Sequence, residues 1–446
     1  MTRFHVLIGL LFAAMSASAD MAEHAQRSQV AGIDLVTYVT GVKDVVIIHG
    51  ALPAGDAFSG AGNAAVPTLT GMMLDRGTRA MDQFAIAQQL ENVGAEISFG
   101  VGTQSLEIRA KCLKKDLPLV IGIIASELRT PALSAQEFAK AKQQFSGLLE
   151  SSLQSTEARS QEAFKRAVFA SGHPNRPHTL EEFLAAVKAA TLDEVKAFHA
   201  KYYGPAHLTL VLAGDVSSAL AVEEVGRAFG GWTGGYDYLA APAESAPSAS
   251  EVKVPLEDKT SVSVIMGQAT GLRYKDPDAL ALRVGTAALG RGFTGRLMST
   301  VRDKEGLTYD IGAGVTDDAL TGGAWELTAS FAPKLLDKGI ESSRREMLKW
   351  WKDGITEREL SLRKQGMIGS YFVGLATTGG VASTILSSIQ RGYDLTWLDR
   401  YPRAVDSLSL SEVNAAIKTH LNPNAMALVE AGSIPPPPPP APAPTP

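Results

Sequence analysis

Cysteine is nearly absent from this chain of 446 residues, which contains only Cys112. A single cysteine excludes an intramolecular disulfide and any zinc site built from several thiolates. There is no basic surplus either, since the formal net charge is −5, whereas a nucleic-acid-binding surface needs an excess of lysine and arginine. After the N-terminal segment no stretch approaches the ~20 apolar residues that span a bilayer, so we expect a soluble mature protein without a membrane span and without a nucleic-acid partner.

The N-terminal segment has the features of an export signal. Arg3 gives a positive start, residues 6–15 are apolar, and residues 17–19 (Ala-Ser-Ala) fit a cleavage site before Asp20. The apolar stretch is too short to span a bilayer, and no cysteine follows it that could carry a lipid anchor. A buried N-terminal helix is the alternative interpretation. The segment predicts a signal peptide over residues 1–19 and a periplasmic or secreted protein.

Two segments of the chain repeat each other. Residues 409–432 match residues 191–214 at an offset of 218, and both read as a helix with a capping box, a proline turn and an apolar strand closed by Ala-Gly. A second pair, residues 93–102 and 305–314, matches at an offset of 212, with glycines coinciding at three positions. Two matches in the same order predict a duplication, and so long a period indicates two domains rather than a solenoid.

The boundary between the repeats lies in a stretch rich in alanine, proline and serine. Residues 239–250 lack periodicity, as linkers do. We therefore predict an N-terminal domain over residues 20–238, a linker over 239–250, and a C-terminal domain over 251–434. Residues 435–446 are rich in proline and predict an extended, disordered tail, with a role as a docking ligand as the alternative.

The mixture of patterns within each domain predicts an α+β fold. Residues 106–112 and 324–331 alternate apolar with polar residues, as half-buried strands do. Ser134 with Glu137, and Thr356 with Glu359, are capping pairs that begin long helical stretches. A strict βαβ alternation is absent, so we expect each domain to be a mainly antiparallel or mixed sheet with helices packed on one face.

Three motifs favour a structural over a chemical role. Residues 290–295 spell G-x-G-x-x-G, but the preceding stretch reads as helix, whereas a dinucleotide site needs a strand there. Cys112 lies on the apolar side of an alternating strand, which predicts a small core residue. His173 and His178 are five apart with two prolines between them, which indicates ordinary loop histidines and no metal pair. The chain therefore looks poorly equipped for hydrolysis by itself.

One segment places a cation and a phenol at a helix-to-strand corner. Arg302 ends an apparent helix, Gly306 breaks it, and Tyr309 opens a strand. Such a pair can hold a peptide carbonyl and donate a hydrogen bond to a developing oxyanion. The structural alternative is an arginine that caps helix carbonyls and a tyrosine that packs on the sheet.

This segment resembles the second domain of the pitrilysin/insulinase family of zinc peptidases, whose pattern is roughly R-E-K-x-G-L-A-Y. The resemblance spans nearly the whole mature chain. It includes residues 74–78 (Leu-Asp-Arg-Gly-Thr) before an apolar helix, residues 199–203 before Pro205, and the strand end at residues 213–216 (Ala-Gly-Asp-Val). The resemblance implies two duplicated α/β-roll domains, in agreement with the repeat.

The same family carries an inverted zinc motif, H-x-x-E-H, shortly before Gly-Thr. Alignment on that dipeptide places Thr68 and Met72 at the histidine positions and Gly71 at the glutamate position. None of these side chains can bind the metal or act as the general base. The family's third ligand is a downstream glutamate, and Glu150 stands 78 residues after Met72, where it is either a remnant of that ligand or a surface helix residue.

Some members of this family are heteromers in which one subunit keeps the zinc motif and the other supplies the Arg/Tyr pair. By resemblance, Arg302 and Tyr309 are that pair: Tyr309 would bond the scissile carbonyl or oxyanion, and Arg302 would position the substrate backbone. The chain is then inactive alone and binds no cofactor. It would form part of a heteromeric zinc metalloendopeptidase, with zinc, water and base on a homologous zinc-bearing partner and a peptide as substrate.

Two other functions compete with this one. The first is a catalytically inert structural or binding protein on the same fold, as in the core subunits of respiratory complexes. The second is an active peptidase with unusual ligands, which the residues at positions 68, 71 and 72 argue against.

Overall fold

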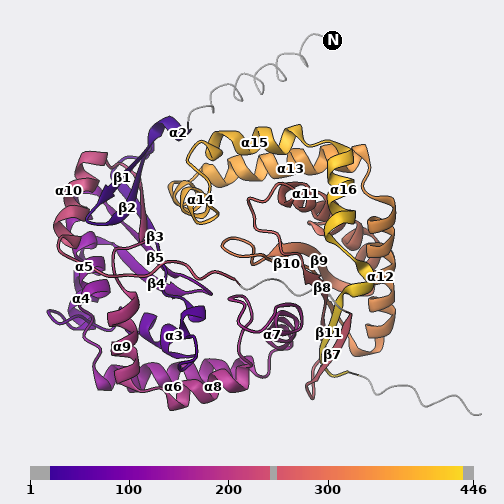
Figure 1. Ribbon diagram of the computed structural model, residues 1–446, viewed down its shortest axis with the longest axis horizontal. Helices are drawn as coiled ribbons and strands as arrows, with labels where there is room; N and C mark the ends of the chain where they lie inside the picture. Colours follow the sequence, from indigo (N-terminus) through magenta and orange to yellow (C-terminus); the bar gives the residue numbers. More distant parts are fainter. Residues whose placement is uncertain (1–20, 242–248, 435–446) are drawn as a thin grey trace, which may run out of the picture.

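The computed structural model describes residues 21–241 and 249–434, which form two α+β halves, each built around one sheet (Figure 1). The N-terminal half holds β1–β6, and the C-terminal half holds β7–β11. The α+β class predicted from the sequence is confirmed. The predicted signal peptide and proline-rich tail lie outside the described residues, as do residues 242–248 of the predicted linker.

The sheet of the N-terminal half has the strand order β1-β2-β6-β3-β5-β4, with one parallel pair, β2 and β6. Its strands are β1 (Ala25–Val30), β2 (Ile33–Val39), β3 (Val45–Leu52), β4 (Glu96–Val101), β5 (Leu106–Leu113) and β6 (Thr209–Gly214). Its helices are α2 (Met21–His24), α3 (Val66–Gly71), α4 (Gln83–Val93), α5 (Leu117–Arg129), α6 (Ala135–Ser152), α7 (Thr156–Val168), α8 (Leu180–Ala189), α9 (Leu192–Tyr202) and α10 (Ser218–Phe229).

The sheet of the C-terminal half has the order β7-β11-β8-β10-β9, again with one parallel pair, β7 and β11. Its strands are β7 (Ser250–Pro255), β8 (Val262–Ala269), β9 (Thr308–Thr316), β10 (Ala324–Phe331) and β11 (Ala427–Gly432). Its helices are α11 (Ala279–Gly290), α12 (Leu336–Asp353), α13 (Glu357–Leu375), α14 (Thr378–Gln390), α15 (Trp397–Ser407) and α16 (Leu410–His420). The order matches that of the other sheet once β1 is set aside.

The predicted repeat corresponds to equivalent elements of the two halves. Helix α9 followed by β6, and α16 followed by β11, are the segments that match at an offset of 218, and β6 and β11 hold the same place in their sheets. Capping boxes begin both helices, at Thr191 with Glu194 and at Ser409 with Glu412. Both strands are buried along their whole length. The shared capping boxes and the shared burial of the two strands thus account for the sequence similarity of these two segments.

Each half sends one helix across to the sheet of the other half (Figure 1). Helix α14 packs Val381, Ala382 and Ile385 against buried residues of β2, β3 and β6. Helix α7 packs Phe164 against Ile265 of β8 and Val429 of β11. Each sheet therefore carries helices on both faces. The sequence predicts helices on one face only, and the second face is covered by the helix from the other half. The exchange joins the halves through two buried apolar clusters.

Among the residues that the structure describes, no single helix is both long and apolar enough to cross a bilayer. Helices α13 and α14 reach that length and composition only as a pair, and they are bent by 116° relative to each other.

Candidate functional site

Arg302 and Tyr309 meet at the start of β9, one of the two edge strands of the C-terminal sheet. Arg302 lies in a π-helical turn (η3, Met298–Lys304), and the chain turns into β9 at Gly306, whose φ of +63° favours glycine. The guanidinium carbon lies 4.9 Å from the centroid of the Tyr309 ring. The tyrosine side chain is 83% exposed, so the predicted cation–phenol pair exists and faces solvent.

A β-bulge directs Tyr309 out of the sheet. Thr308 pairs with Phe331 and Ile311 pairs with Ala329, so two residues of β9 stand opposite Ser330 alone. The Thr308 hydroxyl lies 2.6 Å from the Ser330 carbonyl oxygen and accepts a hydrogen bond from the Asp310 amide at 3.2 Å. Bulges at sheet edges commonly re-aim a side chain. The orientation of Tyr309 is thus built into the backbone.

The alternative interpretation, in which Arg302 caps helix carbonyls and Tyr309 packs on the sheet, does not agree with the structure. Within residues 21–241 and 249–434, the Arg302 guanidinium has no hydrogen-bond or ion-pair partner, so it caps no helix carbonyl; its contacts are two aromatic rings. Tyr309 does not pack on the sheet, because most of its side chain is exposed. An arginine with five N–H donors left free beside an exposed phenol can still bind an acceptor.

Two of the positions that align with the zinc motif, Thr68 and Gly71, lie on α3, and the third, Met72, is its C-cap; their side chains do not fit a metal. The Thr68 hydroxyl donates to an Asp56 carboxylate oxygen at 2.5 Å, and burial raises the pKa of Asp56 to about 6. Gly71 is buried, and a Cβ there would lie 2.3 Å from a methyl carbon of Val101. Met72 has a thioether, a soft and neutral group. In the described part of the chain, no group of three or more His, Cys, Asp or Glu residues could hold a metal ion.

Glu150 has a partner away from α3. Its carboxylate accepts a hydrogen bond from Lys188 of α8 at 3.1 Å, and both side chains are more than half exposed. Arg76 donates hydrogen bonds both to the Met72 carbonyl and to the Gln144 side chain, so Gln144 lies on the side of α6 that is near Met72. Glu150 lies six positions farther along, about 120° around the helix axis at 100° per residue. Among the described residues no hydrogen bond or ion pair connects Glu150 to α3, so it stands as a surface helix residue here.

Rebuilding the motif as Thr68→His, Gly71→Glu and Met72→His is expected to yield a chain that binds no stoichiometric zinc. The Gly71→Glu change alone should lower the free energy of unfolding by about 1–3 kcal/mol, because the new side chain must displace Val101 and Leu106. Elemental analysis and urea unfolding measure both effects. Stoichiometric zinc in the triple variant would contradict the expectation, and Gly147→Glu on the exposed side of α6, with open space at its Cβ, is the control.

Glu127 on α5 is a fully buried carboxyl near Asp75, and one of its oxygens has no hydrogen-bond partner among the described residues. Burial raises its pKa to about 8, and the charge of Asp75 adds to this effect. The folded chain therefore keeps the proton that the unfolded chain loses near pH 4.5, so the free energy of unfolding should fall as the pH rises from about 4.5 to 8.

Glu127→Gln is expected to weaken that pH dependence, by at most about 1.4 kcal/mol per pH unit. Urea unfolding of parent and variant at pH 5 and at pH 8 tests this. The exposed control Glu150→Gln should leave the pH dependence of the parent unchanged. Equal pH slopes in the parent and in Glu127→Gln would refute the assignment.

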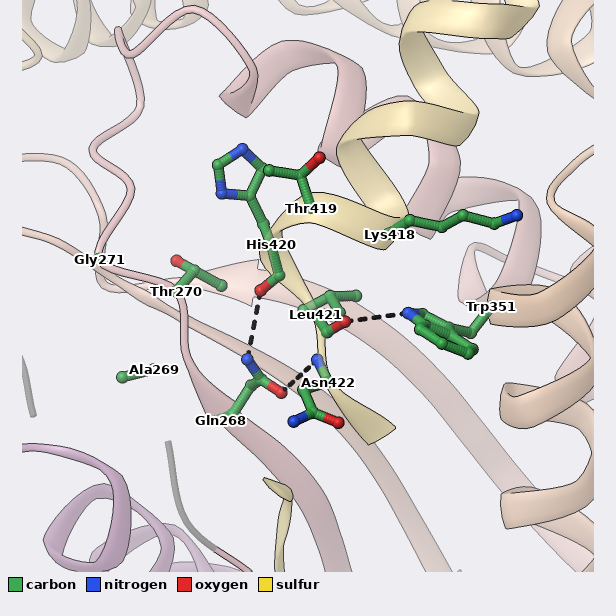
Figure 2. A pocket seen from close by; sticks show the side chains of 10 residues that line it. All are labelled: Gln268, Ala269, Thr270, Gly271, Trp351, Lys418, Thr419, His420, Leu421 and Asn422. Carbon is green, nitrogen blue, oxygen red and sulfur yellow. Dashed lines mark hydrogen bonds between the residues drawn. The ribbon is translucent and has the colours of Figure 1, made fainter. Parts of the chain in front are cut away.

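A cavity of about 440 Å³ lies in the C-terminal half at the junction of α16, β8 and α12, and the sequence gives no sign of it (Figure 2). Most of its polar groups are already paired. Gln268 accepts from the Asn422 amide and donates to the His420 carbonyl, and Trp351 donates to the Leu421 carbonyl. These bonds hold the turn between α16 and β11 in place, so the cavity has a structural explanation and contains neither Arg302 nor Tyr309.

Comparison with known proteins gives consistent similarities in sequence. A family model described as the peptidase M16 inactive domain matches residues 189–367. A Streptomyces coelicolor protein named an uncharacterized zinc protease is 26% identical over 326 residues, which is 70% of this chain and 69% of that protein. A Helicobacter pylori protein named a non-peptidase homolog is 23% identical over 385 residues, which is 84% of this chain and 86% of that one.

Solved structures share the fold. A Pseudomonas fluorescens structure described as a peptidase M16 inactive domain superposes with a TM-score of 0.84 at 23% identity, over 92% of this chain and 97% of that one. The periplasmic protease PqqL of Escherichia coli superposes with a TM-score of 0.76 at 16% identity, and this chain spans 46% of it. The fold is therefore that of these proteins, and the zinc-motif positions of this chain lack the ligands.

Proposed function

Because the chain belongs to the peptidase M16 family, known also as the pitrilysin/insulinase family, and lacks its zinc motif, we propose that it is the non-zinc-binding subunit of a periplasmic zinc metallopeptidase. In this role it binds a homologous subunit that carries H-x-x-E-H and supplies Arg302 and Tyr309 to that partner's active site. The export signal that the sequence predicts at the N-terminus and the description of one structural neighbour as a periplasmic protease support the location.

One observation carries the proposal: the half-buried Arg302 and the exposed Tyr309 are adjacent, and within the described residues their side chains have no hydrogen-bond partner, while the zinc-motif positions are occupied by unsuitable side chains. An arginine kept merely for structure normally pairs with carbonyls or carboxylates of its own chain. A large exposed aromatic beside an unpaired cation is typical of a surface that another molecule covers. The pair is therefore available to a substrate held between two subunits.

Each residue has a distinct part in peptide hydrolysis. The Tyr309 hydroxyl donates a hydrogen bond to the carbonyl oxygen of the scissile peptide, and this bond strengthens as negative charge develops on that oxygen. The Arg302 guanidinium presents planar N–H donors to neighbouring backbone carbonyls and fixes the register of the peptide. The partner subunit contributes the metal, the water and the general base; the described residues of this chain include no group of three or more His, Cys, Asp or Glu side chains that could hold a metal ion.

The test is reconstitution with a zinc-motif member of the family from the same organism. The full mature chain, the partner and the mixture are compared by size-exclusion chromatography, by elemental zinc analysis and by cleavage of an internally quenched unstructured peptide. We expect a mixed complex, zinc only in the partner, and cleavage only by the mixture. Cleavage by this chain alone, or one zinc per copy of it, would refute the proposal.

A catalytically inert structural or binding protein is the second candidate, favoured by the Helicobacter pylori relative named a non-peptidase homolog. The same experiment separates the two. If the partner cleaves the peptide equally well with and without this chain, the inert function is correct.

A further inference from the structure

Phe293 is an exposed aromatic residue on a loop that is held rigidly. Its side chain is 72% exposed, and it sits in the loop between α11 and η3 that contains the G-x-G-x-x-G sequence. The buried Arg363 of α13 donates to the carbonyls of Arg291 and Thr294, which flank it, at 3.0 and 2.7 Å. A large apolar side chain exposed on a braced loop costs little entropy when a ligand covers it.

Two further features keep this loop in place. Arg296 makes a two-pronged ion pair with Glu359, at 2.6 and 2.7 Å, just after the loop. At its start Gly290 lies so close to β9 that a Cβ would come within 2.1 Å of the Ala313 backbone nitrogen. The loop is thus fastened to α13 on one side and to the strand that carries Tyr309 on the other. The position of Phe293 relative to Tyr309 is therefore fixed.

Phe293 also contacts Arg302. The guanidinium carbon lies 5.1 Å from the centroid of the Phe293 ring and 4.9 Å from that of the Tyr309 ring. The described structure shows no contact between the two rings themselves, so they flank the cation instead of stacking on each other. Cations within about 6 Å of a ring centroid are attracted by its π face. Both rings engage the guanidinium group, while its N–H donors have no partner in the described part of the chain.

We propose that Phe293 is a positioning residue that, together with Tyr309, holds the Arg302 guanidinium so that its N–H donors face a peptide carbonyl. This inference rests on the proposed function, because it assigns Phe293 a role in the same site. An unsupported arginine side chain on the surface samples many rotamers and loses that freedom on binding. The two rings restrict the Arg302 side chain before the substrate binds, so less conformational entropy is lost on binding. Phe293 thereby affects substrate binding through Arg302.

The reconstituted complex with the internally quenched peptide tests the role of Phe293. Phe293→Leu should raise KM about two- to fivefold with kcat little changed, the size expected for one exposed cation–π contact. Phe293→Trp, which keeps a π face, should restore the parent KM. Phe84→Leu is the matched control, because Phe84 is 74% exposed on α4 of the other half.

The outcomes separate this inference from the proposed function. If Arg302→Ala weakens cleavage but Phe293→Leu does not, Phe293 has no positioning role while the proposed function stands. If neither change has an effect, the proposed function fails as well. If Phe293→Trp is as impaired as Phe293→Leu, the π face is irrelevant and the cation–π argument is wrong.

A spectroscopic measurement on the isolated chain needs no partner. In protein labelled with ¹⁵N at arginine Nε, the Arg302 Nε–H signal should be displaced by the ring currents of its two neighbours and is assigned through Arg302→Lys. Phe293→Leu should move it toward the position of exposed arginines, whereas Phe84→Leu should not. An Arg302 signal that Phe293→Leu leaves in place would overturn the proposal.

Discussion

Tyr309→Phe is expected to slow peptide cleavage by the reconstituted complex about 100-fold in kcat, with KM nearly unchanged. Loss of one donor to a developing oxyanion typically costs about 10²–10³ in kcat. The substitution removes only the hydroxyl group, and the ring beside Arg302 stays, so the cation–π contact at 4.9 Å survives. Initial rates over a range of peptide concentrations separate kcat from KM.

The matched control for this prediction is Tyr236→Phe, which removes the hydroxyl of a half-exposed tyrosine in the N-terminal half. It should leave kcat and KM at parent values.

Arg302→Ala should chiefly raise KM, because the guanidinium positions the substrate backbone. Arg302→Lys should not restore the parent KM, since an ammonium lacks the planar fork of donors. Full activity in both Tyr309→Phe and Arg302→Ala would favour the inert function.

Elements defined by local patterns were predictable from the sequence. Strand β10 spans Ala324–Phe331, the range that alternation of polar and apolar residues predicts, and β5 shows strict alternation of buried and exposed positions. The capping pairs at Thr191, Thr356 and Ser409 each form both reciprocal hydrogen bonds. These features depend on neighbours within a few residues, so the sequence contains all the information needed.

The site was only partly predictable. The juxtaposition of Arg302 and Tyr309 follows from a helix stop at Gly306, which is a local signal. The exposure of Tyr309 depends on a bulge opposite Ser330, and the contact with Phe293 depends on how the loop 291–295 is fastened to α13. Both are set by pairing between segments far apart in the sequence. The only sequence signal near Phe293 was the glycine-rich turn that contains it.

The exchange of α7 and α14 was not predictable for a related reason. An amphipathic pattern shows that a helix buries one face, but not which sheet it covers. Helix α7 is largely polar, and its deeply buried Phe164 lies on the sheet of the other half. Gly267 of β8 provides the space, because a Cβ there would come 2.8 Å from the Phe164 ring. The partner surface appears only when both halves are folded.

Phe164→Ala is therefore expected to destabilise both halves, although Phe164 belongs to the N-terminal half in sequence. Deleting a fully buried phenylalanine side chain costs about 3–5 kcal/mol, and Phe164 is 0% exposed. The sheet it covers contains Trp325, which is also fully buried, and four of the five tryptophans lie in the C-terminal half, so tryptophan fluorescence reports mainly on that half. In urea, the fluorescence transition and the far-ultraviolet circular dichroism transition should shift together to lower concentration.

The reciprocal change, Ile385→Ala on α14, should lower the free energy of unfolding by about 2–5 kcal/mol through the opposite sheet. The exposed control Phe84→Ala should change that free energy by less than about 0.5 kcal/mol. The contacts beside Phe164 support the coupling: Ser160 is hydrogen-bonded to Ser263 at 2.8 Å, and Lys165 pairs with Asp317 at 2.7 Å. If Phe164→Ala left the fluorescence transition of the C-terminal half in place, the exchanged helix would not couple the halves. Arg302 and Tyr309 would then stand on a sheet whose stability does not depend on the N-terminal half.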